Sequence, residues 1–277
     1  RIDHGHHAVD LLCEADPEEA QRKAEEVGFN NEKRREYDGA ITEEALAMIE
    51  KEGLEENYST VLFSPDWHKG VIGIVASRCI EHHHRPTIIL TESNGRATGS
   101  ARSVRGFSIY KALCECGDLL EKFGGHDYAA GMTLSVEDVP KFQRRFEEVV
   151  RRQIDPELLT PKIFVSAEIQ LDQLTMNFYK VLCRMAPFGP SNRSPIFMAR
   201  QVQLAAPPRL LKERHVKIFV RQQGGSKGFD GILFRRPEVF PNFEVDKPFD
   251  ICFTLEENTF NGRTSLQLLL NDVSWPE

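Results

Sequence analysis

The sequence predicts an α/β domain followed by an all-β barrel, with a charged helical connector in front of both. Three observations predict this fold class. Residues 14–57 are rich in Glu, Lys, Arg and Ala, residues 58–154 alternate between strand-like and helix-like runs, and residues 160–277 hold short runs of high β-propensity. A chain of 277 residues is long enough for two domains, each with its own core.

The connector begins at Asp16, a residue suited to capping a helix, and Pro17 suits the first helical position. Apolar residues recur at near-helical spacing over 40–49, and we expect one interruption of the helix near residues 28–31. The segment 14–57 carries 15 acidic against 6 basic residues, a balance of −9, so the acidic charge behind the net charge of −7 is concentrated there. Such a polar helix typically bridges two bodies rather than filling a core.

The α/β region follows as strands and helices in alternation, which indicates a layered fold. The strands are expected at 59–64, 85–92 and 131–136, and the helices at 69–83, 108–120 and 136–154. Asp155-Pro156 and Thr160-Pro161 then mark a domain boundary.

Six β-rich runs follow this boundary, separated by turns such as those at 223–228 and 257–263 and interrupted by one helix over about 173–185. About five strands with an inserted helix fit a small closed barrel of the OB type, and a β-sandwich is the competing interpretation. Residues 160–277 hold 15 basic against 12 acidic residues, so this part of the chain can approach an anion.

The cysteines, at positions 13, 79, 114, 116, 183 and 252, form no CxxC pair, and we expect reduced thiols in a cytoplasmic protein. No apolar run reaches the length of a membrane span, and no signal peptide opens the chain. We therefore expect no membrane partner. Because the chain begins with Arg1 rather than Met, we expect a fragment or a processed product.

A first candidate site lies where the strand at 59–64 gives way to a helix. Trp67 and His68 occupy this junction, and Gly70 and Gly73 allow close backbone approach as the helix begins. A helix N-terminus presents N–H groups and a partial positive charge, which suits a phosphate. The alternative is a tightly packed corner whose His caps the turn.

A second candidate lies between Gly95 and Gly106, where Ser100, Arg102 and Arg105 stand on what reads as a glycine-bearing loop. Hydroxyls and guanidinium forks together form a good receptor for a terminal phosphate. The alternative is a solvated basic hairpin.

A third candidate is His126, which follows Gly124 and Gly125 and precedes Ala129-Ala130-Gly131. Small neighbours leave such a ring accessible to a ligand, although a lone His is more often structural. The motif by itself does not indicate which reaction it serves.

The opening residues Asp3, His4, His6 and His7 contain ligand types that bind metals. Helical spacing disperses them, and no second cluster completes the converging set that a two-metal site needs. We therefore expect no metal on this chain. The run His82-His83-His84 is better explained as favourable termination of a helix at its negative end.

Three stretches together resemble the C-terminal half of the RecJ family of bacterial single-strand-specific 5′→3′ DNA exonucleases, in the DHH/DHHA1 phosphoesterase superfamily. They are DWHKGVIGIVASR (66–78), GSARSVRGFS (99–108) and GGHDYAAGM (124–132). The resemblance implies that 1–57 is the end of a DHH domain with the connecting helix, 58–157 a DHHA1 domain, and 160–277 an OB domain that binds nucleic acid.

The resemblance also implies roles for the candidate residues. Ser100 and Arg102 would hold the 5′-phosphate of the strand, and His126 would face the catalytic cleft in support of catalysis. The remaining residues expected to contact the strand or its phosphate are Trp67, His68, Arg105, Gly124 and Gly125.

The metal ligands of the family lie in motifs that come before the first residue of this chain. Cleavage by Mn²⁺ or Mg²⁺ would therefore depend on a DHH domain absent here, and the fragment alone is expected to be inactive. Single-stranded DNA would be the substrate, in DNA repair and recombination, and a helicase or a single-strand-binding protein would be a protein partner. The alternatives are a stand-alone nucleic-acid-binding module and a small-nucleotide phosphodiesterase of the same superfamily.

Overall fold

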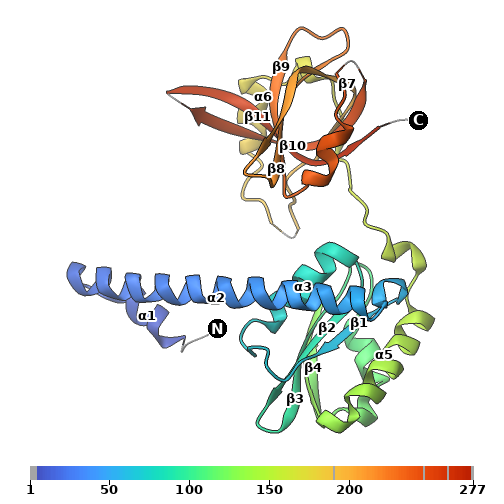
Figure 1. Cartoon of the computed structure of the whole chain (residues 1–277). Coiled ribbons are helices and arrows are strands. Elements are labelled where there is room, and N and C mark those ends of the chain that lie inside the picture. The colour runs from blue at the N-terminus through green and yellow to red at the C-terminus, as the bar shows by residue number, and fades with distance from the viewer. Residues whose placement is uncertain (1–4, 190, 246, 261, 276–277) are drawn as a thin grey trace. The chain divides into compact units, whose positions relative to one another are not determined.

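The computed structural model describes residues 5–189, 191–245, 247–260 and 262–275. The chain divides into two compact units, residues 1–161 and 162–277, and each has a hydrophobic core of its own (Figure 1).

The first unit opens with helix α1 (His6–Leu12) and the long helix α2 (Pro17–Lys51). Asp16 caps α2 as expected, because its side chain accepts hydrogen bonds from the N–H groups of Glu18 and Glu19. The expectation of an interruption at 28–31 was wrong, because α2 is continuous over its 35 residues and includes this segment. Gly28 is exposed and costs the helix only about 1 kcal/mol, too little to break it.

A five-stranded sheet forms the centre of the first unit, in the order β1-β2-β3-β5-β4. β1 and β2 are parallel, and the other neighbours are antiparallel. The strands are β1 (Thr60–Phe63), β2 (Thr87–Ser93), β3 (Arg96–Arg102), β4 (Lys122–His126) and β5 (Ala129–Leu134).

Two of these strands were not expected. The segment 96–102, interpreted as a loop, is β3, and 122–126, assigned no element, is β4. Both segments contain glycine, which is depleted in strands, so the sequence gives little local signal. The ladder compensates, because β3 is hydrogen-bonded on both sides, to β2 and to β5.

Helices cover the sheet from two sides. α3 (Ile72–His83) lies on one face, and α4 (Ile109–Cys114) and α5 (Val139–Gln153) lie on the other (Figure 1). The C-terminal half of α2 packs along α3 and buries Ile41, Ala45 and Ile49. Short 3₁₀ turns complete the unit at Leu54–Glu56, Gly117–Leu119, Val136–Asp138 and Pro156–Leu159.

The second unit is a closed barrel, which confirms the OB-type prediction over the sandwich. Its sheet runs β10-β11-β9-β8-β7-β6, and β10 also pairs with β7, which closes the sheet on itself. The strands are β6 (Ala167–Glu168), β7 (Phe197–Leu211), β8 (His215–Gln222), β9 (Gly228–Phe234), β10 (Phe249–Phe260) and β11 (Arg263–Ser274).

One helix, α6 (Met176–Cys183), is inserted between β6 and β7 as expected, and 3₁₀ turns lie at Leu171–Gln173 and Pro237–Asn242. The β-rich run at 162–171 contributes only the two residues of β6. The expected turn at 257–263 is mostly strand, because the hairpin pairing of β10 with β11 extends to Phe260 and Arg263. Among the described helices, none is both long and apolar enough to cross a membrane.

Candidate nucleic-acid interface

Ser100 and Arg102 meet the beginning of α3. Both stand on β3, and Arg102 Nη1 donates a hydrogen bond to Ser100 Oγ over 3.0 Å. A Cβ atom at Gly73, in the first turn of α3, would lie 2.9 Å from Ser100 Oγ and 2.8 Å from Arg102 Nη2. The hydroxyl and the guanidinium therefore lie directly against bare helix backbone, where the helix dipole favours an anion.

Trp67 is buried rather than presented to a ligand. Its side chain is 3% exposed, and Nε1 donates to Glu44 Oε2 on α2 over 2.9 Å. Its carbonyl oxygen accepts a hydrogen bond from Thr91 Oγ1 on β2 at 2.6 Å. The expectation that Trp67 directly contacts the DNA strand does not fit this burial. Trp67 can shape the site only through its neighbours.

His68 is half-buried and held from two sides. Its Nδ1 accepts the N–H of Gly70 at 3.0 Å, and its ring stacks on Tyr37 of α2 with centroids 5.4 Å apart and planes 13° from parallel. No local pattern indicates Tyr37 or Glu44, because both belong to a helix more than 20 residues earlier.

His126 ends β4 at the tip of the β4–β5 hairpin and is exposed. Its Nδ1 accepts the N–H of Tyr128 at 3.3 Å. The residue before it must be glycine, since Gly125 has a φ of +154° and a Cβ there would lie 2.3 Å from the carbonyl oxygen of Ala129. Gly125 is thus a requirement of the hairpin that carries His126, whereas a Cβ at Gly124 would meet nothing within 4 Å.

The strand register places the candidates on one face of the sheet. Arg102 pairs with Ala129, which pairs with His126, and Ser100 pairs with Gly131, which pairs with Gly124. Directly paired residues point to the same face of the sheet. Because neighbouring strands lie about 4.8 Å apart, the Cα atoms of His126 and Arg102, two strands apart, are separated by roughly 10 Å. Between them lie only small residues, and Gly131 and Gly124 are exposed.

Arg105 is exposed in the loop that leaves β3. Two backbone hydrogen bonds tie this loop to the hairpin tip: Ser103 N–H donates to the Tyr128 carbonyl at 3.1 Å, and Ile109 N–H to the Asp127 carbonyl at 3.0 Å. The loop and the hairpin, separated by about 20 residues, therefore form one rim.

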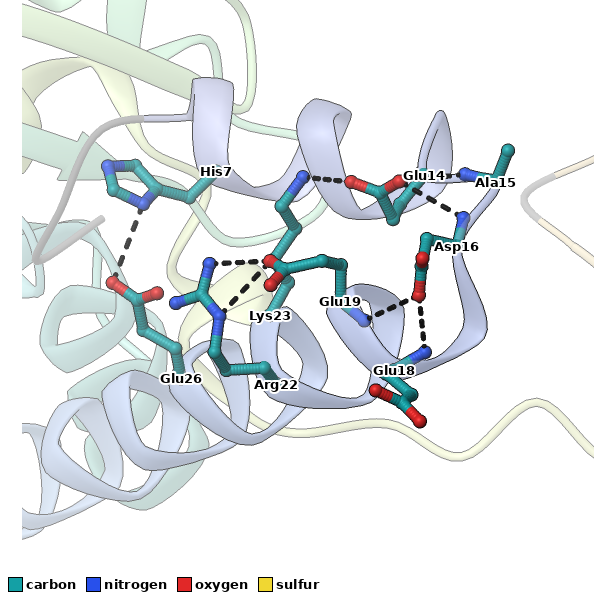
Figure 2. A network of polar contacts seen from close by, with 9 residues as sticks. All are labelled: His7, Glu14, Ala15, Asp16, Glu18, Glu19, Arg22, Lys23 and Glu26. Carbon is teal, nitrogen blue, oxygen red and sulfur yellow. Dashed lines mark hydrogen bonds and ion pairs between the residues drawn. The ribbon is translucent and has the colours of Figure 1, made fainter.

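Of the N-terminal histidines that the structure describes, His7 lies beside a carboxylate of α2. Figure 2 shows His7 Nδ1 facing Glu26 of α2, at 3.6 Å from Oε1. In the same network Lys23 binds Glu14, and this ammonium holds the pKa of the Glu14 carboxyl below its usual range. Asp3 and His4 lie outside the described residues.

The donor set does not fit a metal ion within the part of the chain that the structure describes. No three His, Cys, Asp or Glu side chains are grouped there in a way that could hold one.

The second unit presents aromatic and basic side chains on the outer side of β8 and β9. Phe219 is 38% exposed and Phe234 52%, and Arg221 is also exposed. Phe229, on the opposite side of β9, is 7% exposed and belongs to the barrel core. Because side chains alternate between the two sides of a strand, Phe219 and Phe234 are exposed whereas Phe229 lies in the core.

A shallow hollow lies beside Phe219. Lys217 pairs with Asp230 at 3.1 Å, and Gly228 leaves room for the Phe219 ring, which a Cβ there would approach to 2.4 Å. The hollow is lined by Ala206, Pro207, Arg209, Lys217, Ile218, Phe219 and Asp230. Exposed rings beside cations form the type of surface on which unpaired bases stack.

Comparisons with known proteins match both units. A family model described as the DHHA1 domain matches residues 56–152, and one described as the RecJ OB domain matches residues 165–272. The single-stranded-DNA-specific exonuclease RecJ of Bacillus subtilis is 32% identical over 280 residues, which cover 100% of this chain and 35% of that protein. The Escherichia coli enzyme of the same name is 34% identical over 96% of this chain and 47% of its own length.

Among solved structures, RecJ from Thermus thermophilus in complex with Mn²⁺ superposes with a TM-score of 0.82 at 27% identity. This match covers 98% of the chain and 39% of that protein. The chain thus spans about half or less of the length of the curated relatives it matches.

Proposed function

Because this chain is a homologue of the RecJ exonucleases that contains their DHHA1 and OB domains, we propose that it positions single-stranded DNA for a 5′→3′ exonuclease used in repair and recombination. We assign residues 1–57 to the end of a DHH domain with the connecting helix, 58–157 to the DHHA1 domain and 160–277 to the OB domain. The chemical step would belong to the DHH domain of the parent protein.

The meeting of Gly73, Ser100 and Arg102 is the single observation that carries this proposal. The guanidinium and the hydroxyl would bind two oxygens of a 5′-phosphate, and the N–H groups at the start of α3 would bind a third. Arg102 is fixed in place by its bond to Ser100 Oγ and by a second bond, from Nη1 to the Ala101 carbonyl at 2.7 Å. A fixed receptor loses little side-chain entropy on binding.

His126 would act from the edge strand β4 on the same face of the sheet. Its Cα atom lies roughly 10 Å from that of Arg102, which is two strand spacings. A nucleotide held by its 5′-phosphate at Arg102 could place its next phosphodiester near this ring. The bare surface at Gly124 and Gly131 would let the strand lie close to the sheet, and Arg105 on the adjoining rim would add positive charge.

The solved relatives are complexes with Mg²⁺ and Mn²⁺. The side chains described in this chain do not fit such an ion, so we propose that metal-dependent cleavage uses ligands from the DHH domain of the parent.

The OB domain would bind single-stranded DNA through Phe219, Phe234 and Arg221 on its outer face. Exposed rings beside cations on this second domain support long DNA strands rather than dinucleotides as substrate. A helicase or a single-strand-binding protein would deliver the strand. All six cysteines are free thiols, which suits a reducing compartment, and we place the protein in the cytoplasm.

The test is binding of a fluorescent single-stranded oligonucleotide carrying either a 5′-phosphate or a 5′-hydroxyl, measured by anisotropy with this chain. We expect tighter binding of the phosphorylated strand, and we expect Ser100→Ala with Arg102→Ala to remove about tenfold of that preference, since hydrogen bonds to charged groups contribute 1.5–3 kcal/mol. Arg144→Ala, an exposed arginine on α5 across the sheet, is the matched control.

Equal affinity of the wild-type chain for both strands would contradict the phosphate site. Affinity that does not fall as salt concentration rises would contradict nucleic-acid binding altogether, because counterion release drives it.

A further inference from the structure

Polar and aromatic side chains of helix α2 contact α3 and the turn that precedes it. Three side chains of α2 contact this turn or α3 itself. The pairs are Tyr37 with His68, Glu44 with Trp67, and Asp38 with Arg78. The connecting helix therefore does more for α3 than cover it with apolar side chains.

The bond between Glu44 and Trp67 fixes the indole. Trp67 is 3% exposed, and a buried N–H requires an acceptor, which Glu44 supplies as a charged oxygen at 2.9 Å. On the other side, the Thr91 hydroxyl of β2 holds the Trp67 carbonyl at 2.6 Å. The turn is thus held between a helix and a strand by two polar contacts.

The stack of Tyr37 on His68 fixes the next residue. With the ring planes 13° from parallel, His68 has little freedom to rotate, and its Nδ1 accepts the N–H of Gly70 at 3.0 Å. The His68 carbonyl accepts the N–H of Val71, the residue that caps α3. The ring position of His68 is therefore linked to the backbone where α3 begins.

Asp38 fixes the direction of α3 further along. It is fully buried, and its Oδ2 accepts from Arg78 Nη2 at 2.7 Å and pairs with Arg34 Nη1 at 3.4 Å. Two points on α3, its first turn and Arg78, are thus tied to the same helix.

The first turn of α3 has almost no tolerance for displacement. Gly73 already lies so close to Ser100 Oγ and Arg102 Nη2 that one added carbon would overlap both. A small shift of the turn would change the distance between the helix N–H groups and the guanidinium, which together form the proposed phosphate site.

We propose that Tyr37 and Glu44 of the connecting helix are positioning residues for this site: they set its affinity for a 5′-phosphate without touching the phosphate. The inference rests on the proposed function of Ser100 and Arg102, and it assigns to α2 a part in substrate selection.

The experiment compares Tyr37→Ala and Glu44→Ala with Tyr37→Phe and Glu44→Gln in the full 277-residue chain. The quantity is the ratio of the Kd for a 5′-hydroxyl oligonucleotide to the Kd for its 5′-phosphorylated counterpart. We expect the two alanine variants to lower this ratio roughly two- to fivefold, the size of a helix-dipole interaction with one anion. The Phe and Gln variants keep the stack and the acceptor, so they should keep the ratio.

Phe29→Ala and Glu43→Ala are matched controls, because they remove an exposed aromatic ring and an exposed carboxylate from the same helix. The indole N–H signal of Trp67 and the ring signals of His68 in NMR spectra report whether the turn has moved. A general loss of stability of the protein would weaken the binding of both oligonucleotides equally, so the ratio of the two Kd values would not change.

A wild-type ratio in the alanine variants, with the Trp67 and His68 signals displaced, would overturn the inference and leave the phosphate site intact. A ratio near one in the wild-type chain would instead contradict the phosphate site, and the inference with it. If Glu44→Ala lowers the melting temperature strongly, Tyr37→Ala carries the test, since Tyr37 is 42% exposed.

Discussion

At the scale of single residues, two glycines decide the shape of the candidate surface for different reasons. Gly125 is required by backbone, because its φ is +154° and any Cβ would meet the backbone of the adjacent strand. Gly73 is required by side chains, since the atoms that a Cβ would meet are the ends of Ser100 and Arg102. Replacing the first disturbs the fold, whereas replacing the second disturbs the site.

Gly73→Ala should therefore keep the fold and lose the phosphate preference. Alanine is favoured over glycine inside a helix by about 1 kcal/mol, which offsets part of the cost of moving the Arg102 guanidinium and the Ser100 hydroxyl out of their hydrogen bond. We expect a melting temperature within a few degrees of the wild type and equal affinity for 5′-phosphate and 5′-hydroxyl strands. A retained preference would mean that the phosphate does not bind between α3 and β3.

The cysteines differ strongly in environment. Burial raises the pKa of the Cys79 thiol to about 12, and burial, ahead of the nearby charges, raises that of Cys116 to about 11. A raised thiol pKa keeps the group protonated and unreactive well above neutral pH, since the thiolate is the nucleophile.

We therefore expect thiol reagents at pH 8 to modify the exposed Cys13, Cys114 and Cys183 rapidly, and Cys79 and Cys116 only after denaturation. Mass spectrometry of the labelled peptides measures this. Rapid labelling of Cys79 in the native protein would show that α3 opens away from α2 and the sheet.

At the scale of elements, the two halves of α2 are stabilised in different ways. Its first half is mostly exposed and depends on its cap, on its own ion pairs, such as Arg22 with Glu19 at 2.8 Å, and on the pairs of Lys23 with Glu14 and of Glu26 with His7 (Figure 2). Its second half, from Asp38 onward, is packed on α3. Because few apolar contacts support the first half, its stability should respond directly to helix propensity.

Gly28→Ala tests this, since a Cβ at Gly28 would meet nothing within 4 Å. The gain of 0.5–1 kcal/mol expected for an exposed helical position should slow amide hydrogen exchange across residues 20–36 by roughly two- to fivefold. Phosphate preference should not change. Unaltered exchange would mean that this half of the helix is held by something other than its own propensity.

At the scale of the whole molecule, the two units are built as separate bodies. The barrel core and the core of the α/β unit share no residue, and the described side chains from Lys162 to Glu168 are all exposed. Such a segment between two cores is a preferred site of proteolysis.

Limited trypsin treatment should therefore cut after Lys162 before it cuts within either unit, and both fragments should persist. Mass spectrometry of the time course identifies the first cut. Early cleavage inside β8 or α5 would show that one unit depends on the other for its fold.

The sequence by itself determined the kinds of structure present and their family. Residues 16–17 start the connecting helix, the β-rich runs after Pro161 form a closed barrel, and the motifs at Trp67, Ser100 and His126 matched a known family. These are properties of short stretches, because capping, hydrophobic periodicity and turn chemistry act over a few residues.

Only the tertiary structure decided which residues meet. β3 and β4 exist because ladders on neighbouring strands compensate for their glycine residues, and Trp67 is buried because α2 supplies Glu44 for its N–H. Ser100 and Arg102 reach Gly73 from 27 or more positions along the chain, and Tyr37 reaches His68 across 31. Such contacts depend on strand register and helix packing, which no local pattern in the chain encodes.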